Sequence, residues 1–238
     1  MNASPEVSTD VDLKPGQILR RYLDLYKYLA LLCSRELYFN RADRFSDRFE
    51  GALTPAFRKA RNEAHRQKLV DTDADHFYRR SRIGNYANCW SLGAHDNMAL
   101  WQLYGASQNA VVITTTVDKL VKTALEWNEQ ILIHKVQYID HFKNPDMIVG
   151  RYTDFLRFKH KAYRYEAELR MIVPRQHSQW ENNPSAIRLP VRNLNTLFRS
   201  VVVSPEAELS FYNLIKDVSQ KYGITKPIRR SKLTWLPK

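Results

Sequence analysis

A stretch of alternating residues around position 168 constrains the fold of this chain more than any other part of the sequence. From Tyr163 to Val173 the chain reads Y-R-Y-E-A-E-L-R-M-I-V, with an apolar or aromatic residue at every second position. A period of two is typical of a β-strand that packs one face and exposes the other. On such a strand Glu166 and Glu168 point the same way, roughly 6.5–7 Å apart, whereas a helix would turn them to nearly opposite sides. We therefore predict a strand that presents two carboxylates on one face.

Two interpretations of this acidic pair are open, because Arg164 and Arg170 flank it. Two carboxylates between two arginines, beside aromatic rings, can form a catalytic site. They can equally form an ion-pair ladder on a solvated sheet face, which is the commoner arrangement. The residues of this stretch alone do not choose between the two.

Length and composition predict one folded α+β domain. At 238 residues, with 44% hydrophobic and 12% aromatic residues, the chain can bury a substantial core. Residues 1–14 are polar and unpatterned, so we predict a disordered tail followed by a single domain over 15–238. Strands are predicted at 85–92 and 111–116 and a short helix at 98–104. Thr54-Pro55 predicts the start of a basic helical insertion over 52–82.

The charge balance favours a polyanionic partner. Lysine and arginine number 37 against 25 acidic residues, which gives a net charge of +12. Nucleic acid fits such a charge better than a membrane surface, and the basic stretch 57–82 is a candidate for contacting phosphates. No apolar run approaches transmembrane length and no signal-peptide pattern is present, so we expect a cytoplasmic protein without a membrane partner.

Several chemistries find no support in the sequence. Neither G-x-x-x-x-G-K-[ST] nor G-x-G-x-x-G occurs, so a phosphate-binding loop is not expected. The histidines are scattered and neither cysteine has a partner at ligand spacing, so we expect no metal site. Cys89 lies among aromatic residues, where a reactive thiolate is disfavoured.

What remains is the acidic pair, with Lys27 and Ser91 as polar companions from two other strands. Carboxylates suit the cleavage of an N-glycosidic bond, which needs no metal and no phosphate loop. One carboxylate stabilises the cation-like sugar, and the second orients or deprotonates the incoming nucleophile. The sequence permits this mechanism without requiring it.

Eight blocks of the sequence resemble a large bacterial family of uncharacterised proteins. The first three are L-Y-K-Y, E-L-Y-F and R-F-S-D-R-F-E-G, at 25–28, 36–39 and 44–51. The others are N-C-W-S, N-M-A-L-W-Q-L-Y, V-V-I-T-T-T, V-Q-Y and K-A-Y-R-Y-E-A-E-L-R, at 88–91, 97–104, 111–116, 136–138 and 161–170. In the third block Ser46 and Arg48 replace the usual Asn and Pro of the family, while Asp47 and Glu50 are kept.

That family is in turn remotely similar to the ADP-ribosyltransferases. The resemblance implies a mixed, mainly antiparallel sheet with a helical insertion. It also implies transfer of ADP-ribose from NAD, used as a substrate, to nucleic acid or protein, in a toxin or phage-defence role with a neutralising partner protein. Glu168 would be the catalytic residue and Glu166 would orient the acceptor. The residues that would contact NAD are Lys27, Tyr28, Trp90, Ser91 and Arg170. Lys27 stands where those enzymes carry His or Arg on their first strand.

Two other functions stay open. The first is a cofactor-free nucleic-acid-binding or nuclease-like defence protein that uses the basic stretch 57–82. The second is a non-catalytic interaction module in which the Glu and Arg side chains form a structural ladder. For a surface ladder we expect Glu168→Gln to change stability by about 1 kcal/mol or less.

Overall fold

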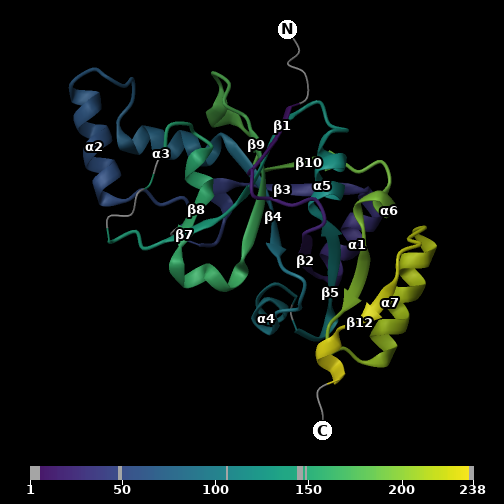
Figure 1. Ribbon diagram of the computed structural model, residues 1–238. Helices are drawn as coiled ribbons and strands as arrows, with labels where there is room; N and C mark the ends of the chain where they lie inside the picture. The colour runs from purple at the N-terminus through teal and green to yellow at the C-terminus, as the bar shows by residue number, and fades with distance from the viewer. Residues whose placement is uncertain (1–5, 48–49, 106, 144–146, 148, 236–238) are drawn as a thin grey trace. The chain divides into compact units, whose positions relative to one another are not determined.

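The computed structural model describes residues 6–47, 50–105, 107–143, 147 and 149–235 (Figure 1). Its contacts divide the chain into two compact units, each gathered from three separated stretches. The first unit comprises Met1–Asp10, Tyr38–Cys89 and Glu129–Arg188, and the second comprises Val11–Leu37, Trp90–Asn128 and Leu189–Lys238. Because neither unit is contiguous in sequence, a single domain over 15–238 stays a prediction.

The first unit is built on mixed β-pairing. Its strands are β1 (Glu6–Thr9), β6 (Gln130–Lys135), β9 (Glu168–Pro174), β7 (Gln137–Ile139), β8 (Phe158–His160), and parts of β3 (Glu36–Arg41), β4 (Asn85–Leu92) and β10 (Ala186–Pro190). β1 runs parallel to β6, and β6 runs antiparallel to β9. β3 runs antiparallel to β4, and β7 pairs with β8 in a separate parallel sheet.

Two helices of the first unit stand where the basic helical insertion was predicted. α2 (Pro55–Arg66) starts with Pro55 after the Thr54 N-cap, whose hydroxyl accepts from the Phe57 amide at 3.2 Å. α3 (Ala74–Ile83) is capped by Asp73, whose carboxylate accepts from the His76 amide at 2.8 Å. These caps satisfy amides that have no partner within a helix. The 3₁₀ helices of this unit are η1 (Ala42–Arg44), η3 (Asp154–Arg157), η4 (Lys161–Glu166) and η5 (Trp180–Asn182).

The second unit combines mainly antiparallel strands with helices. Its strands are β2 (Ile18–Asp24), β5 (Ala110–Thr116), β11 (Ser200–Val203), β12 (Ile228–Arg230) and the end of β4. β2 is antiparallel to β4 and to β5, β5 is antiparallel to β11, and β11 is parallel to β12. Its helices are α1 (Leu25–Ser34), α4 (Met98–Gly105), α5 (Val117–Ala124), α6 (Leu194–Leu197), α7 (Leu209–Lys221), η2 (Ser107–Asn109) and η6 (Lys232–Trp235).

These pairings confirm the predicted fold class. The protein is α+β, and its strand pairs are mixed and mainly antiparallel. β5 illustrates why such segments form strands. Its β-branched residues pack well on a pleated surface, and six of its seven residues are buried. In the described part of the chain, no helix has both the length and the apolar character needed to cross a membrane.

The predicted disordered tail is wrong over residues 6–10. Residues Glu6–Thr9 form β1, and the Asp10 carboxylate then accepts from the Lys135 amide at 2.8 Å and contacts His134 at 2.7 Å. Arg157 donates to the same carboxylate at 2.9 Å. Backbone pairing with β6 and this ionic contact order a segment whose own side chains give no pattern. Residues 1–5 lie outside the described part of the chain.

Candidate active site

The two glutamates are brought together by a turn, so the predicted strand over 163–173 is wrong in its first half. β9 starts only at Glu168, and residues Lys161–Glu166 form the 3₁₀ helix η4. Between them Ala167 adopts the left-handed conformation, with φ 43° and ψ 52°. This conformation reverses the chain, so that Glu166 and Glu168 reach the same cation. The predicted proximity of the carboxylates is found, but its structural cause differs.

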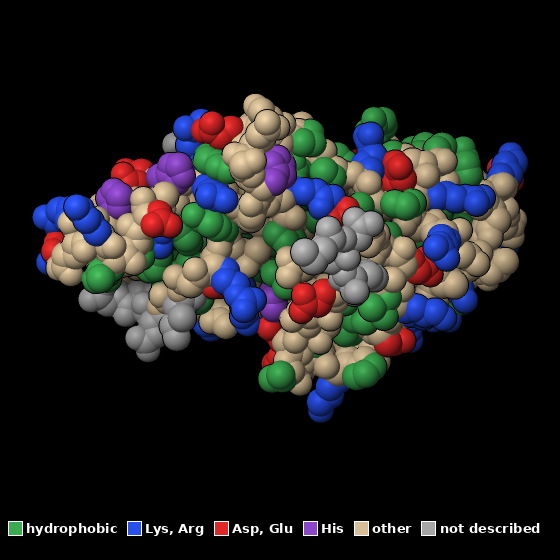
Figure 2. Space-filling model, turned by 90° about the horizontal axis from the view of Figure 1, so that it is seen from above, with side chains coloured by type: hydrophobic (Ala, Val, Ile, Leu, Met, Phe, Trp, Pro, Cys, Tyr) green, Lys and Arg blue, Asp and Glu red, His purple; other side chains and the backbone are tan. Residues whose placement is uncertain are grey.

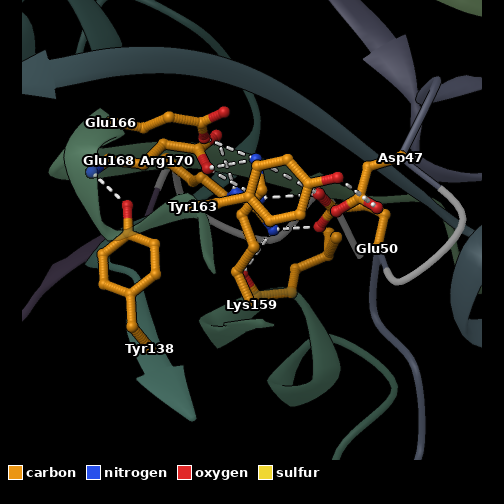
Figure 3. Close-up of polar contacts among 9 residues, drawn as sticks. Asp47, Glu50, Tyr138, Lys159, Tyr163, Glu166, Glu168 and Arg170 are labelled. Atoms are coloured by element: carbon orange, nitrogen blue, oxygen red, sulfur yellow. Dashed lines mark hydrogen bonds and ion pairs between the residues drawn. The ribbon is translucent and has the colours of Figure 1, made fainter. Parts of the chain in front are cut away.

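That cation is Lys159, at the centre of β8. Its Nζ lies 2.5 Å from Glu166 Oε2 and 3.4 Å from Glu168 Oε2 (Figure 3). A third carboxylate oxygen, Glu50 Oε2, lies 3.8 Å away. All four side chains are at most 7% exposed. A ladder on a solvated sheet face is therefore wrong, because this ionic cluster is buried.

Arg170 occupies the middle of the cluster and uses all of its donors within the protein. Its Nε and Nη2 donate to the two oxygens of Glu168 at 3.0 and 2.8 Å. Its Nη1 and Nη2 donate to the two oxygens of Glu50 at 2.5 and 2.9 Å. Nη1 also donates to the Leu156 carbonyl at 2.9 Å. A guanidinium has five N–H donors, so the predicted contact of Arg170 with NAD would require one of these bonds to break.

The cluster carries one more negative than positive charge, since Glu50, Glu166 and Glu168 face Lys159 and Arg170. Burial on its own would raise the pKa of Glu168, but the charges of Arg170 and Lys159 outweigh burial and lower this pKa to about 2. Burial raises the pKa of Glu50, with Glu168 adding to the effect and Arg170 opposing it. Glu168 is therefore firmly ionised, and Glu50 accepts a proton more readily.

Aromatic side chains adjoin this cluster. The Tyr163 ring centroid lies 4.8 Å from Lys159 Nζ, and its hydroxyl donates to Asp47 Oδ1 at 3.1 Å. Tyr165 lies beside it, with ring centroids 6.4 Å apart, and is 41% exposed. The Tyr138 hydroxyl accepts from the Glu168 amide at 2.8 Å and so fixes the start of β9. Rings that reach the surface thus lie next to buried charges.

Lys27 and Tyr28, predicted on a first strand, lie on helix α1 of the second unit. Asp24 caps this helix by accepting from the Lys27 amide at 2.7 Å, and it also pairs with Lys27 Nζ at 2.8 Å. The Lys27 side chain is 60% exposed. Tyr28 is fully buried, and its hydroxyl bonds Ser219 Oγ at 2.8 Å. Strand placement for this pair is wrong because the side chain of Asp24 starts a helix there.

Trp90 and Ser91 lie on β4 as predicted. Trp90 is only 2% exposed, with the guanidinium of Arg21 5.9 Å from its ring centroid. Ser91 is paired in the sheet register with Arg20 of β2. β2 therefore carries an arginine opposite Ser91, in the run L-R-R-Y at 19–22, which sequence reasoning missed. Arg20 is itself held by Asp96 at 2.8 Å.

Lys159 and Glu50 were also missed as site residues. Glu50 had a signal, since it is one of two acidic residues kept in the R-F-S-D-R-F-E-G block. Lys159 had none beyond its place next to the alternating stretch. Among the described residues no cluster of His, Cys, Asp and Glu could hold a metal ion. Burial and the neighbouring Glu168 raise the pKa of the Cys89 thiol.

No protein-family model matches this chain. No curated protein matches it either. Two solved structures of DarT from Thermus sp. 2.9 are similar to it. One, in complex with ADP-ribosylated ssDNA, has a TM-score of 0.44 and 9% identity, over 93% of this chain and 97% of that chain. The other, in complex with carba-NAD+, has a TM-score of 0.43 and 7% identity, over 93% and 98%. A likeness of this degree does not decide activity, substrate or partner.

Proposed function

We propose that this protein transfers ADP-ribose from NAD to a macromolecular acceptor, either nucleic acid or protein. The observation that carries the proposal is the buried excess of one negative charge around Lys159 and Arg170. Burying an unbalanced charge is costly unless a partner of opposite charge can approach it. A toxin or phage-defence role with a neutralising partner belongs to the same proposal.

The bond cleaved in NAD matches this charge. The nicotinamide ring is cationic, and the ribose becomes cation-like as the N-glycosidic bond breaks. A preorganised carboxylate in a site of low dielectric stabilises such a developing charge more than water does. Glu168 is suited to this role because it stays ionised at neutral pH.

Glu166 is proposed to orient the acceptor. It lies at the end of η4, next to the exposed ring of Tyr165, and its carboxylate faces Lys159. A carboxylate in this position can hold or deprotonate an incoming nucleophile once a contact of the cluster opens. Because the cluster is closed by its own ion pairs, substrate binding has to displace at least one of these contacts.

Of the residues proposed to contact NAD, two are not buried. Lys27 is exposed and Ser91 is half-buried, whereas Tyr28 and Trp90 are 0% and 2% exposed. The N–H donors of Arg170 are all engaged within the protein. Lys27 and Ser91 are therefore the contacts to test first by mutation.

The basic helices are less suited to nucleic acid than their charge suggests. Arginines of α2 and α3 are stacked on aromatic rings: Arg58 and Arg82 on Tyr78, Arg61 on Phe77, Arg79 on Trp180 and Arg80 on Tyr152. Arg58 and Arg79 are also paired with Asp75 and Glu181. In Figure 2, basic and acidic side chains are interspersed over these helices, at the left. We therefore do not propose α2 and α3 as the acceptor surface.

A non-catalytic role is the competing proposal, because Arg170 is fully saturated. In that case the cluster would only hold β9, η4 and Glu50 together. The two proposals differ in whether NAD is consumed.

NAD labelled on its adenylate phosphate tests the proposal directly. The protein is incubated with this NAD and with total cell RNA, DNA or protein, and each fraction is then digested with nuclease or protease. We expect label in one acceptor class, released only by the matching digestion. Absence of both transfer and NAD hydrolysis in all three mixtures would favour the non-catalytic role.

A further inference from the structure

We propose that Glu50 is a positioning residue that fixes the Arg170 guanidinium and, through it, the Glu168 carboxylate. This inference rests on the proposed function for its catalytic meaning, but its geometry stands independently. In Figure 3 the guanidinium lies between the two carboxylates. Its two edges are used in the same way, with a pair of N–H···O bonds to each. Bidentate pairs of this kind fix the plane of the guanidinium as well as its distance.

Backbone contacts on either side of Glu50 position it toward Arg170. The Glu50 amide donates to the Asp47 carbonyl at 3.1 Å. Gly51 follows with φ +65°, and a Cβ at this position would overlap the Phe155 ring. Only glycine adopts this conformation freely and leaves room for the ring. The Glu50 side chain itself is only 1% exposed.

The surroundings of Arg170 leave it one position. Phe155 and Leu156 belong to η3. The Leu156 carbonyl accepts the one N–H of Arg170 that neither carboxylate accepts. The Phe45 ring centroid lies 5.8 Å from Arg170 Cζ. Arg170 itself is fully buried. Loss of Glu50 would therefore leave two buried N–H donors without an acceptor, which is costly, and would remove the bonds that hold the guanidinium on that side.

The direction in which the pKa of Glu168 changes on loss of Glu50 distinguishes two roles for Glu50. Its pKa depends on the groups that face it, which are Arg170, Lys159, Glu50, Glu166, Cys89 and the Tyr138 hydroxyl. If Glu50 acts only as a nearby negative charge, its removal lowers the pKa of Glu168. If Glu50 holds Arg170 in place, its removal weakens the Arg170–Glu168 pair and raises this pKa.

The test is a titration of the Glu168 carboxyl by ¹³C NMR, with its signal assigned from its absence in Glu168→Gln. In Glu50→Gln we expect the pKa of Glu168 to rise by ~1 unit or more. The matched control is Glu166→Gln, which removes an equal charge from the Lys159 side of the cluster. There we expect the pKa of Glu168 to fall or stay where it is. An unchanged or lowered pKa in Glu50→Gln would overturn the proposal.

A second variant covers the case in which Glu50→Gln does not fold. Glu50→Asp keeps the charge but withdraws the carboxylate by one methylene group, so the pair with Arg170 is lost without a change of charge. We expect the pKa of Glu168 to rise in this variant as well, and an unchanged value would contradict the positioning role. The titration needs no NAD. If the protein proves inactive on NAD while these shifts occur, the proposed function fails and the positioning role stands.

Discussion

Glu168 is ionised well below its ordinary pKa because Arg170 and Lys159 face it in a buried setting. Its contribution to stability is present above the pKa of about 4.5 that it has when unfolded, and it is lost as the pH falls toward about 2. This position differs from a surface ladder, one of the two interpretations of the sequence, for which a change of about 1 kcal/mol or less was predicted. Removing one partner of a buried ion pair leaves the other uncompensated, so the cost is larger.

We therefore expect Glu168→Gln to lower the free energy of unfolding by about 3 kcal/mol at pH 7. Below pH 4.5 the wild-type protein should lose stability faster than the variant, so that the two curves converge as the pH approaches about 2. Urea unfolding at a series of pH values measures both quantities. A difference under 1 kcal/mol at pH 7, or one that does not change with acid pH, would disagree with a buried, ionised Glu168.

At the scale of elements, the junction of η4 and β9 decides how the two glutamates meet. Ala167 holds a left-handed conformation that costs a non-glycine residue ~1 kcal/mol or more. Strain of this kind persists only where the surroundings impose it, and it is often found at functional sites. Here the Tyr138 hydroxyl on one side and the Lys159–Glu166 pair on the other hold the junction.

Substitution of Ala167 tests this strain. We expect Ala167→Gly to raise the free energy of unfolding by about 0.5–1 kcal/mol, because glycine adopts positive φ without a steric cost. Ala167→Val should lower it by at least 1 kcal/mol or so, since β-branched residues fit this region worst. Ala162→Gly is the matched control on the same helix, outside the positive-φ residues, and it should be destabilising. The same sign for Ala167→Gly and Ala162→Gly would argue against strain at the junction.

The elements that sequence predicted well are those determined by their own residues. β4 was predicted with its observed bounds and β5 within one residue, because runs of aromatic and β-branched residues favour strands locally. The Thr54 cap was likewise visible, since capping depends on near neighbours. β1 was missed because its partner strand begins only at Gln130. The alternation before Glu168 led to a wrong strand prediction, because K-A-Y-R-Y-E fits a 3₁₀ helix as readily as a strand.

At the scale of the whole molecule, the candidate site could be predicted only in part. Glu166, Glu168 and Arg170 are close in sequence, so their pattern was visible. Glu50 is 120 residues away from Arg170, and its role depends on tertiary contacts that no local pattern shows. For the same reason no local sequence pattern predicts that the contacts of the chain divide into two units. The buried ionic cluster lies in the first unit. Its excess of negative charge can be counted only when the positions of all five side chains are known.

The release of nicotinamide from NAD is the most direct measure of the central claim, that this cluster is catalytic. Wild-type protein, Glu168→Gln and Asp10→Asn are compared at equal concentrations of folded protein, with the acceptor class found by labelling. Asp10→Asn is the matched control, because it breaks a partly buried ion pair of the same unit outside the cluster. We predict release by wild type, a fall in kcat of about 100-fold or more in Glu168→Gln, and little change in Asp10→Asn. Full activity of Glu168→Gln, or no release by the wild-type protein, would contradict the account.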